Sequence, residues 1–177
     1  MTAWIRALRH NFFSGKSIIK PFSNRLDTTT ALLSPDDDSQ LILFIPFTSQ
    51  VKVKSFCVVA AGTTAPSVVK VWTNREDIDF SNANDVVPSQ DFNLVEGGDQ
   101  DGSIFYPTKL QKFQNVSSLT MFFCNRDGTD QTRITYVGFK GEYTKNKREV
   151  VQFVYEARAN PADHKTTDKS KPFHDIS

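Results

Sequence analysis

The sequence predicts an all-β protein that folds as a β-sandwich with the strand order of a jelly roll. Roughly seven or eight short apolar stretches alternate with turn-forming residues, and the body of the chain lacks a long helical pattern. Phenylalanine is heavily used, with 15 residues, and β-branched residues are frequent, a balance that favours sheet over helix. A chain of 177 residues is long enough for one domain that buries about two-thirds of its unfolded surface without a disulfide or a metal.

The central strand pair is expected at residues 41–60, where two apolar runs meet at 46–50. The first run is apolar at nearly every position, which indicates a strand covered on both faces. The second run alternates, with Lys52 and Lys54 expected on the solvent side. The opposite, core-facing set is expected to be Val51, Val53, Ser55, Cys57 and Val59. On such a rigid scaffold, functional residues are expected in the loops and termini.

The remaining strands follow from shorter patterns separated by turn signals. Edge strands are expected at residues 91–95 and from residue 104 onward, where Pro107 cannot donate to a central ladder. A hairpin with an Asp-Gly turn is expected to pair 119–124 with 133–138. Three further segments are expected: a strand at 68–72, a long surface loop at 73–90 and a last strand at 150–155.

Both ends of the chain differ in composition from the body. Residues 1–15 form a divergent basic arm, in which 1–13 has the spacing of a short amphipathic helix. A mitochondrial targeting peptide has the same character, and that alternative stays open. The sandwich is expected over residues 16–157. Residues 158–177 are polar and lack a core-facing pattern, which predicts an extended tail.

The composition argues against several functional classes. The formal net charge of +1 provides no global field for nucleic acid, and no segment approaches the ~20 apolar residues of a membrane span. The three histidines, His10, His164 and His174, lie outside the predicted sandwich, so a catalytic triad or metal site would depend on the chain ends. Cys57 and Cys124 are expected as reduced thiols, with a disulfide between neighbouring strands as the alternative. We expect no catalytic residues, no cofactor and no metal of the protein's own.

Several segments carry a family resemblance. They are 18–22 (IIKPF), 25–27 (RLD), 38–48 (DSQLILFIPFT), 51–55 (VKVKS), 112–116 (KFQNV), 138–142 (GFKGE) and 155–165 (YEARANPADHK). In this order they resemble the PITH (proteasome-interacting thioredoxin) domain, of the stand-alone PITH-domain-containing protein type. The basic start at 1–13 departs from the longer N-terminus, with a Cys-Leu-Asn element, that is usual in the family. Thioredoxin chemistry is not implied, because the chain has no CxxC pair.

The resemblance implies a galactose-binding-like jelly-roll sandwich without catalytic activity, found in cytoplasm and nucleus and associated with the 26S proteasome regulatory particle. We therefore expect a protein-interaction module that docks on a large assembly. A basic loop is expected to steer docking onto an acidic partner through Lys145, Lys147 and Arg148. A tail contact is expected from Asn160, Pro161, Asp163, His164, Phe173, His174 and Ile176. The imidazole of His174 is a candidate ligand for the open zinc position of that particle's deubiquitinase.

Two alternatives use the same scaffold. The first is a structural or adaptor component of another assembly, for example a cytoskeletal lattice. The second is a carbohydrate- or small-ligand-binding sandwich, for which Trp72 beside Thr73, Asn74 and Arg75 is the candidate aromatic platform. Because Trp72 ends an apolar strand, a place in the core is the competing interpretation.

Overall fold

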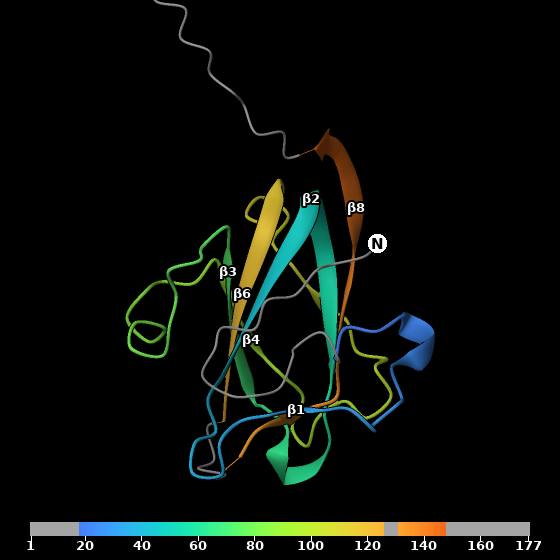
Figure 1. The fold of residues 1–177 in the computed structure, drawn as a ribbon, viewed down its shortest axis with the longest axis vertical. Coiled ribbons are helices and arrows are strands. Elements are labelled where there is room, and N and C mark those ends of the chain that lie inside the picture. Colours follow the sequence, from blue (N-terminus) through green and yellow to red (C-terminus); the bar gives the residue numbers. More distant parts are fainter. Residues whose placement is uncertain (1–17, 126–130, 148–177) are drawn as a thin grey trace, which may run out of the picture.

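The computed structural model describes residues 18–125 and 131–147, in which every regular element is a strand or a short 3-10 turn (Figure 1). The strands are β1 (Leu32–Leu33), β2 (Leu41–Val59), β3 (Val68–Thr73), β4 (Gln90–Asn93), β5 (Tyr106–Pro107), β6 (Val116–Cys124), β7 (Arg133–Ile134) and β8 (Tyr136–Lys147). The 3-10 turns are η2 (Phe22–Asn24) and η3 (Gly62–Thr64). The described part is therefore all-β, as the sequence predicts.

The longest strand, β2, belongs to both layers of a sandwich. Residues 41–46 pair antiparallel with β6, whereas residues 51–59 pair antiparallel with β8. The β2–β6 register shifts between Pro46 and Val51, and Figure 1 shows β2 folding back into two arms at its upper end. The two apolar runs expected from the sequence are thus one strand that changes layer at their junction.

Each arm of β2 organises its own layer. The first arm continues through β6 and β3 to β4, which gives the order β4-β3-β6-β2. The second arm carries β8 along one edge and the two-residue β5 along the other. The small strands β1 and β7 pair with one another. Both β4 and β5 end the sheet order, which confirms the predicted edge positions and leaves Pro107 outside any central ladder.

The core lies between the two arms of β2 and is formed by apolar side chains from both layers. Its most deeply buried members include Leu43, Ile45, Phe56, Val69, Met121 and Phe123. The rings of Phe56 and Phe92 pack edge to face with centroids 4.8 Å apart, which joins the second arm of β2 to β4. Side chains that interdigitate in this way hold the two layers in a fixed relation.

The prediction of which residues of the second β2 arm face the core is only partly correct. Val51 and Val53 face the core, but the register with β8 shifts between Val53 and Ser55. Beyond the shift Phe56 and Val58 join the main core. The predicted members Cys57 and Val59 instead pack in a separate cluster with Tyr136. One extra residue in a strand exchanges its two faces, because side chains alternate with a period of two.

The predicted pairing of 119–124 with 133–138 is wrong. Both edges of β6 are occupied, one by β2 and the other by β3, so no edge remains for another strand. Residues 133–134 form β7 beside β1, and β8 pairs with β2. The Asp-Gly pair of the expected turn and the strand expected at 150–155 lie outside the described residues.

Candidate protein-binding surface

One buried carboxylate organises the loop that follows β4. Asp99 is 5% exposed, and its oxygens accept hydrogen bonds from the backbone N–H groups of Asp101 (3.2 Å), Gly102 (3.0 Å) and Ile104 (2.8 Å). The Asp99 carbonyl accepts a further hydrogen bond from the N–H of Ala60, just after β2. Hydrogen bonds to an ionised carboxylate are stronger than neutral ones. The Asp99 loop, residues 97–104, is therefore fixed against the end of β2.

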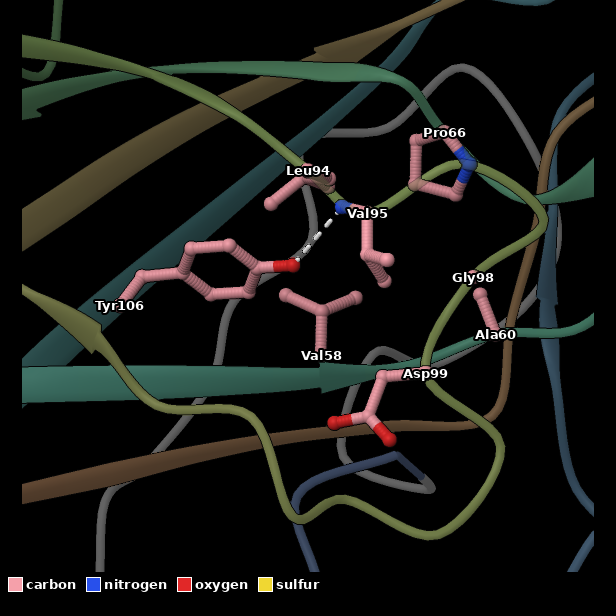
Figure 2. A pocket seen from close by; sticks show the side chains of 8 residues that line it. All are labelled: Val58, Ala60, Pro66, Leu94, Val95, Gly98, Asp99 and Tyr106. Carbon is pink, nitrogen blue, oxygen red and sulfur yellow. Dashed lines mark hydrogen bonds between the residues drawn. The ribbon is translucent and has the colours of Figure 1, made fainter.

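A small cavity lies beside the Asp99 loop (Figure 2). Its lining is Val58, Ala60, Pro66, Leu94, Val95, Gly98, Asp99 and Tyr106. The Tyr106 hydroxyl accepts a hydrogen bond from the Val95 N–H at 3.0 Å, while Figure 2 shows the Asp99 carboxylate pointing away from the cavity. The cavity volume of about 10 Å³ leaves room for about one water molecule and is far below the about 300–1,000 Å³ of a typical ligand site. We interpret the cavity as a packing feature of the loop.

Two aromatic rings and two cations meet on the surface beyond this loop. We call Phe22, Arg25, Phe105 and Lys140 the ring–cation cluster. The ring centroids of Phe22 and Phe105 are 6.1 Å apart. The Arg25 guanidinium carbon lies 4.2 Å from the Phe22 centroid, and the Lys140 Nζ lies 3.4 Å from the Phe105 centroid. Each cation is attracted by the negative face of its ring.

The cluster is anchored to the body of the sandwich. Arg25 donates its Nε–H to the Asp101 carbonyl at 2.7 Å, which ties η2 to the Asp99 loop. Phe105 packs against a buried patch formed by Cys57, Val59 and Tyr136. Burial raises the pKa of both the Cys57 thiol and the Tyr136 hydroxyl, so both groups are neutral near pH 7. The floor beneath Phe105 is therefore apolar and uncharged.

Lysines extend from the cluster along the outward face of β2 and β8. In the β2–β8 register Lys52 lies opposite Glu142 and Ser55 lies opposite Lys140, and cross-strand neighbours share a face. Lys54 forms an ion pair with Glu142, and its hydrogen bond lowers the pKa of the Glu142 carboxyl. Lys52, Lys54 and Lys140 therefore give this face an excess of positive charge.

The site residues predicted from the sequence fall elsewhere. Lys145 and Lys147 lie in β8, with Lys147 opposite Ser49, so the prediction of a loop at these two positions is wrong. Their role in steering stays a prediction. Arg148 and all the predicted tail residues lie outside the described residues, as do the three histidines. No pattern in the sequence predicts the ring–cation cluster, because its members come from three separate parts of the chain.

Trp72 belongs to the core rather than to a binding platform. Its side chain is 1% exposed and packs with Ile78, Ala83 and Phe122. This second apolar cluster lies beneath the loop between β3 and β4, which Figure 1 shows on the side of the sandwich away from η2. An indole buried to this extent has no free face for a sugar ring. The candidate carbohydrate platform is therefore excluded at this position.

The described residues offer little for redox or metal chemistry. Cys57 is buried and Cys124 is partly buried, and no disulfide joins them, so that alternative is not realised. Within 18–125 and 131–147, no three His, Cys, Asp or Glu side chains are grouped as a metal site requires. In the same residues, no helix has both the length and the apolar character needed to cross a membrane.

Solved structures with the same architecture define the class of protein. The C-terminal domain of a chitobiase from Bacteroides fragilis superposes with a TM-score of 0.52 at 14% identity, covering 74% of this chain and 82% of that one. The domain CBM32-3 from a family 31 glycoside hydrolase of Clostridium perfringens superposes with a TM-score of 0.50 at 12% identity. The match covers 80% of this chain and 89% of that one. At such low identity the likeness shows the fold alone. That fold is a galactose-binding-like jelly-roll sandwich.

Sequence similarity places the chain more narrowly within this class. The family model of the PITH domain matches residues 8–159. PITH domain-containing protein 1 of Dictyostelium discoideum is 36% identical over 165 residues, covering 93% of this chain and 80% of that protein. The Homo sapiens protein of the same name is 34% identical over 166 residues, covering 93% of this chain and 77% of that protein. The chain belongs to the PITH domain family.

Proposed function

We propose that this chain is a non-catalytic protein-interaction module that docks on a large assembly, the regulatory particle of the 26S proteasome. The ring–cation cluster is the observation that carries the proposal. Aromatic and arginine side chains are the residue types in which binding energy concentrates at protein interfaces. Because the Asp99 loop already holds this surface in place, little conformational entropy is lost on binding. Membership of the PITH family supports a non-enzymatic role.

The predicted tail is the second contact of the proposal. A segment tethered to a docked sandwich has a high effective concentration at any groove within reach, so weak contacts suffice. The contact residues proposed there are Asn160, Pro161, Asp163, His164, Phe173, His174 and Ile176. Phe173 would anchor the segment, and the neighbouring His174 imidazole would bind the open zinc position of the particle's deubiquitinase.

Affinity purification tests the partner. The tagged full-length chain is incubated with cell extract at about 100 mM salt, where surface charge still acts over about 10 Å. We expect regulatory-particle subunits to be recovered together and in constant proportion, as measured by quantitative mass spectrometry. Recovery no higher than from a tag-only control would refute the proteasome as the partner and would favour the adaptor alternative in another assembly.

Variants of the tail test the second contact. Truncation after Lys165 and the substitution His174→Ala are compared with the full chain for binding to purified regulatory particle and for the particle's deubiquitinase activity. Ser170→Ala is the matched control, because it changes the same tail without removing a candidate ligand. We expect the truncation to weaken binding and His174→Ala to alter deubiquitinase activity. If both variants bind the particle and affect its deubiquitinase activity as the unmodified chain does, docking depends on the sandwich alone.

Steering by the basic stretch is tested through charge reversal. Replacing Lys145, Lys147 and Arg148 together by Glu should slow association with an acidic partner, and the difference from the unmodified chain should shrink as salt rises. Unchanged association at low salt would remove this stretch from the proposal. The proposed location is cytoplasm and nucleus. Intact-mass measurement on protein from its native source checks the alternative, because mitochondrial import would remove residues 1–13.

A further inference from the structure

Arg25 and Lys140 are held on aromatic rings, and no carboxylate of residues 18–125 or 131–147 forms an ion pair with them. Within the described residues Lys20 pairs with Asp27 and Lys54 pairs with Glu142, but Arg25 and Lys140 form no ion pair. Attraction to a ring positions a cation while leaving its full charge in place. Among the residues that the structure describes, no group takes up the positive charge of the cluster, which is therefore available to a ligand.

The same surface exposes apolar area next to the two cations. Phe22 is 48% exposed, and Leu26, which follows Arg25 in the chain, is 55% exposed. Ile104, which precedes Phe105 in the chain, is 36% exposed. Apolar exposure rimmed by charge is typical of interaction sites rather than of plain solvated surface. A ligand that fits must therefore combine negative charge with apolar side chains.

The carboxylates of Asp27 and Asp101 form hydrogen bonds within their own loops. The Asp101 carboxylate accepts a hydrogen bond from the Ser103 N–H at 3.1 Å. Asp27 accepts hydrogen bonds from Thr29 and from Lys20. Neither carboxylate forms an ion pair with Arg25 or Lys140. On the adjoining face of β2 and β8 three lysines outnumber Glu142, so the charge balance there favours an acidic ligand over a basic one.

We propose that the ring–cation cluster receives an acidic segment of the partner protein, with carboxylates at Arg25 and Lys140 and an apolar side chain against Phe22. This inference rests on the proposed role as a protein-interaction module and names the chemistry of its partner. Lys52 and Lys54, on the same face of β2 and β8, extend the attraction along the sandwich. The carboxylates of the segment neutralise the two cations, and its apolar side chain covers the exposed ring.

The test is an NMR titration of the isotope-labelled full-length chain with a defined probe. The probe is a synthetic acidic peptide of alternating Glu and Ser with one central Phe, and the control peptide has Gln at every Glu position. We expect the acidic peptide to shift the amide signals of Phe22, Arg25, Phe105 and Lys140. Raising the salt from about 50 mM to about 500 mM should weaken binding strongly, because exposed charges are then screened.

Two substitutions and one matched control locate the contact. Lys140→Gln removes one cation, and we expect about threefold weaker binding of the acidic peptide, the scale of one exposed ion pair. Phe22→Ser should weaken it by a further similar factor through lost apolar contact. Lys112→Gln changes another exposed lysine outside the cluster and should leave the affinity unchanged.

Several outcomes would overturn the inference. Equal binding of the Gln peptide would show that charge is not recognised, and shifts confined to residues outside the cluster would place the contact elsewhere. Equal shifts with inorganic phosphate or a short RNA would indicate a phosphate site instead. The titration contains no proteasome, so its failure is separate from failure of the co-purification. If the acidic peptide binds but no proteasome subunits are recovered, the ring–cation cluster remains a binding site for acidic segments, and only the proteasome is rejected as the partner.

Discussion

Substitution of Gly98 tests whether the Asp99 loop is as tightly packed as the structure indicates. Gly98 has a φ of +80°, and a Cβ added there would collide with the Ala60 carbonyl oxygen and lie 2.7 Å from the Ala65 Cβ. The neighbouring Gly97 has a similar φ of +73°, but a Cβ there would have no neighbour within 4 Å. The two glycines therefore share a conformational constraint and differ in the space around them.

The expected cost separates into two parts. A positive φ costs an alanine about 1–2 kcal/mol at either position. Forcing a methyl group into packed backbone adds about 1–3 kcal/mol, and this second part applies only to Gly98. We therefore expect Gly97→Ala to lower the free energy of unfolding by about 1 kcal/mol and Gly98→Ala to lower it by about 3 kcal/mol.

Urea unfolding of the two variants and the parent chain measures both values. The slope of the transition should stay constant, so that the shift in midpoint reports stability. The packing argument fails if Gly98→Ala is no more destabilising than Gly97→Ala. That result would mean that the loop moves away from Ala60 at little cost, and the rigid presentation of Phe105 would lose its basis.

Three further changes probe other contacts. Asp99→Ala leaves the backbone N–H groups it binds without their acceptor and should lower the free energy of unfolding by about 2–4 kcal/mol; an unaltered urea midpoint would contradict this. Phe56→Ala, at a ring 1% exposed, should cost about 3–5 kcal/mol, whereas Phe80→Ala, at a ring 45% exposed, should cost under about 1 kcal/mol; similar calorimetric shifts for both would argue against the core assignment. Hydrogen bonds from Thr29 lower the pKa of Asp27 from 3.8 to about 2. Its ionised form therefore stabilises the folded state above pH 3.8, and this contribution is lost as the pH falls through 2; a carboxyl NMR midpoint near 3.8 would refute the effect.

Most of the fold follows from local pattern in the sequence. The alternation around Lys52 and Lys54 identifies an amphipathic strand, and Pro107 indicates an edge, because both signals depend only on neighbouring residues. The register shift after Val53 has no such signal. A single extra residue leaves the apolar character of the segment unchanged while exchanging its faces, so the predicted side of Cys57 is wrong.

The ring–cation cluster could not be predicted from local sequence patterns for a different reason. Phe22 lies in η2 and Arg25 directly follows it, Phe105 follows the Asp99 loop, and Lys140 lies in β8. Their meeting depends on β8 pairing with β2 instead of with β6, which is the pairing that the sequence analysis had wrong. Long-range strand order is set by which edges remain free, and a single sequence does not encode that in any short window.

The passage of β2 through both layers has a mechanical consequence. Its second arm borders the face that carries Lys140, while its first arm is hydrogen-bonded to β6. A pull applied by a partner at the ring–cation cluster is therefore transmitted along one covalent backbone into the opposite layer. The two layers cannot separate completely under such a load unless β2 gives up its pairing in one of them, because the two arms are one covalent strand. The covalent continuity of β2 thus joins the two layers mechanically in addition to the packing of the core between them.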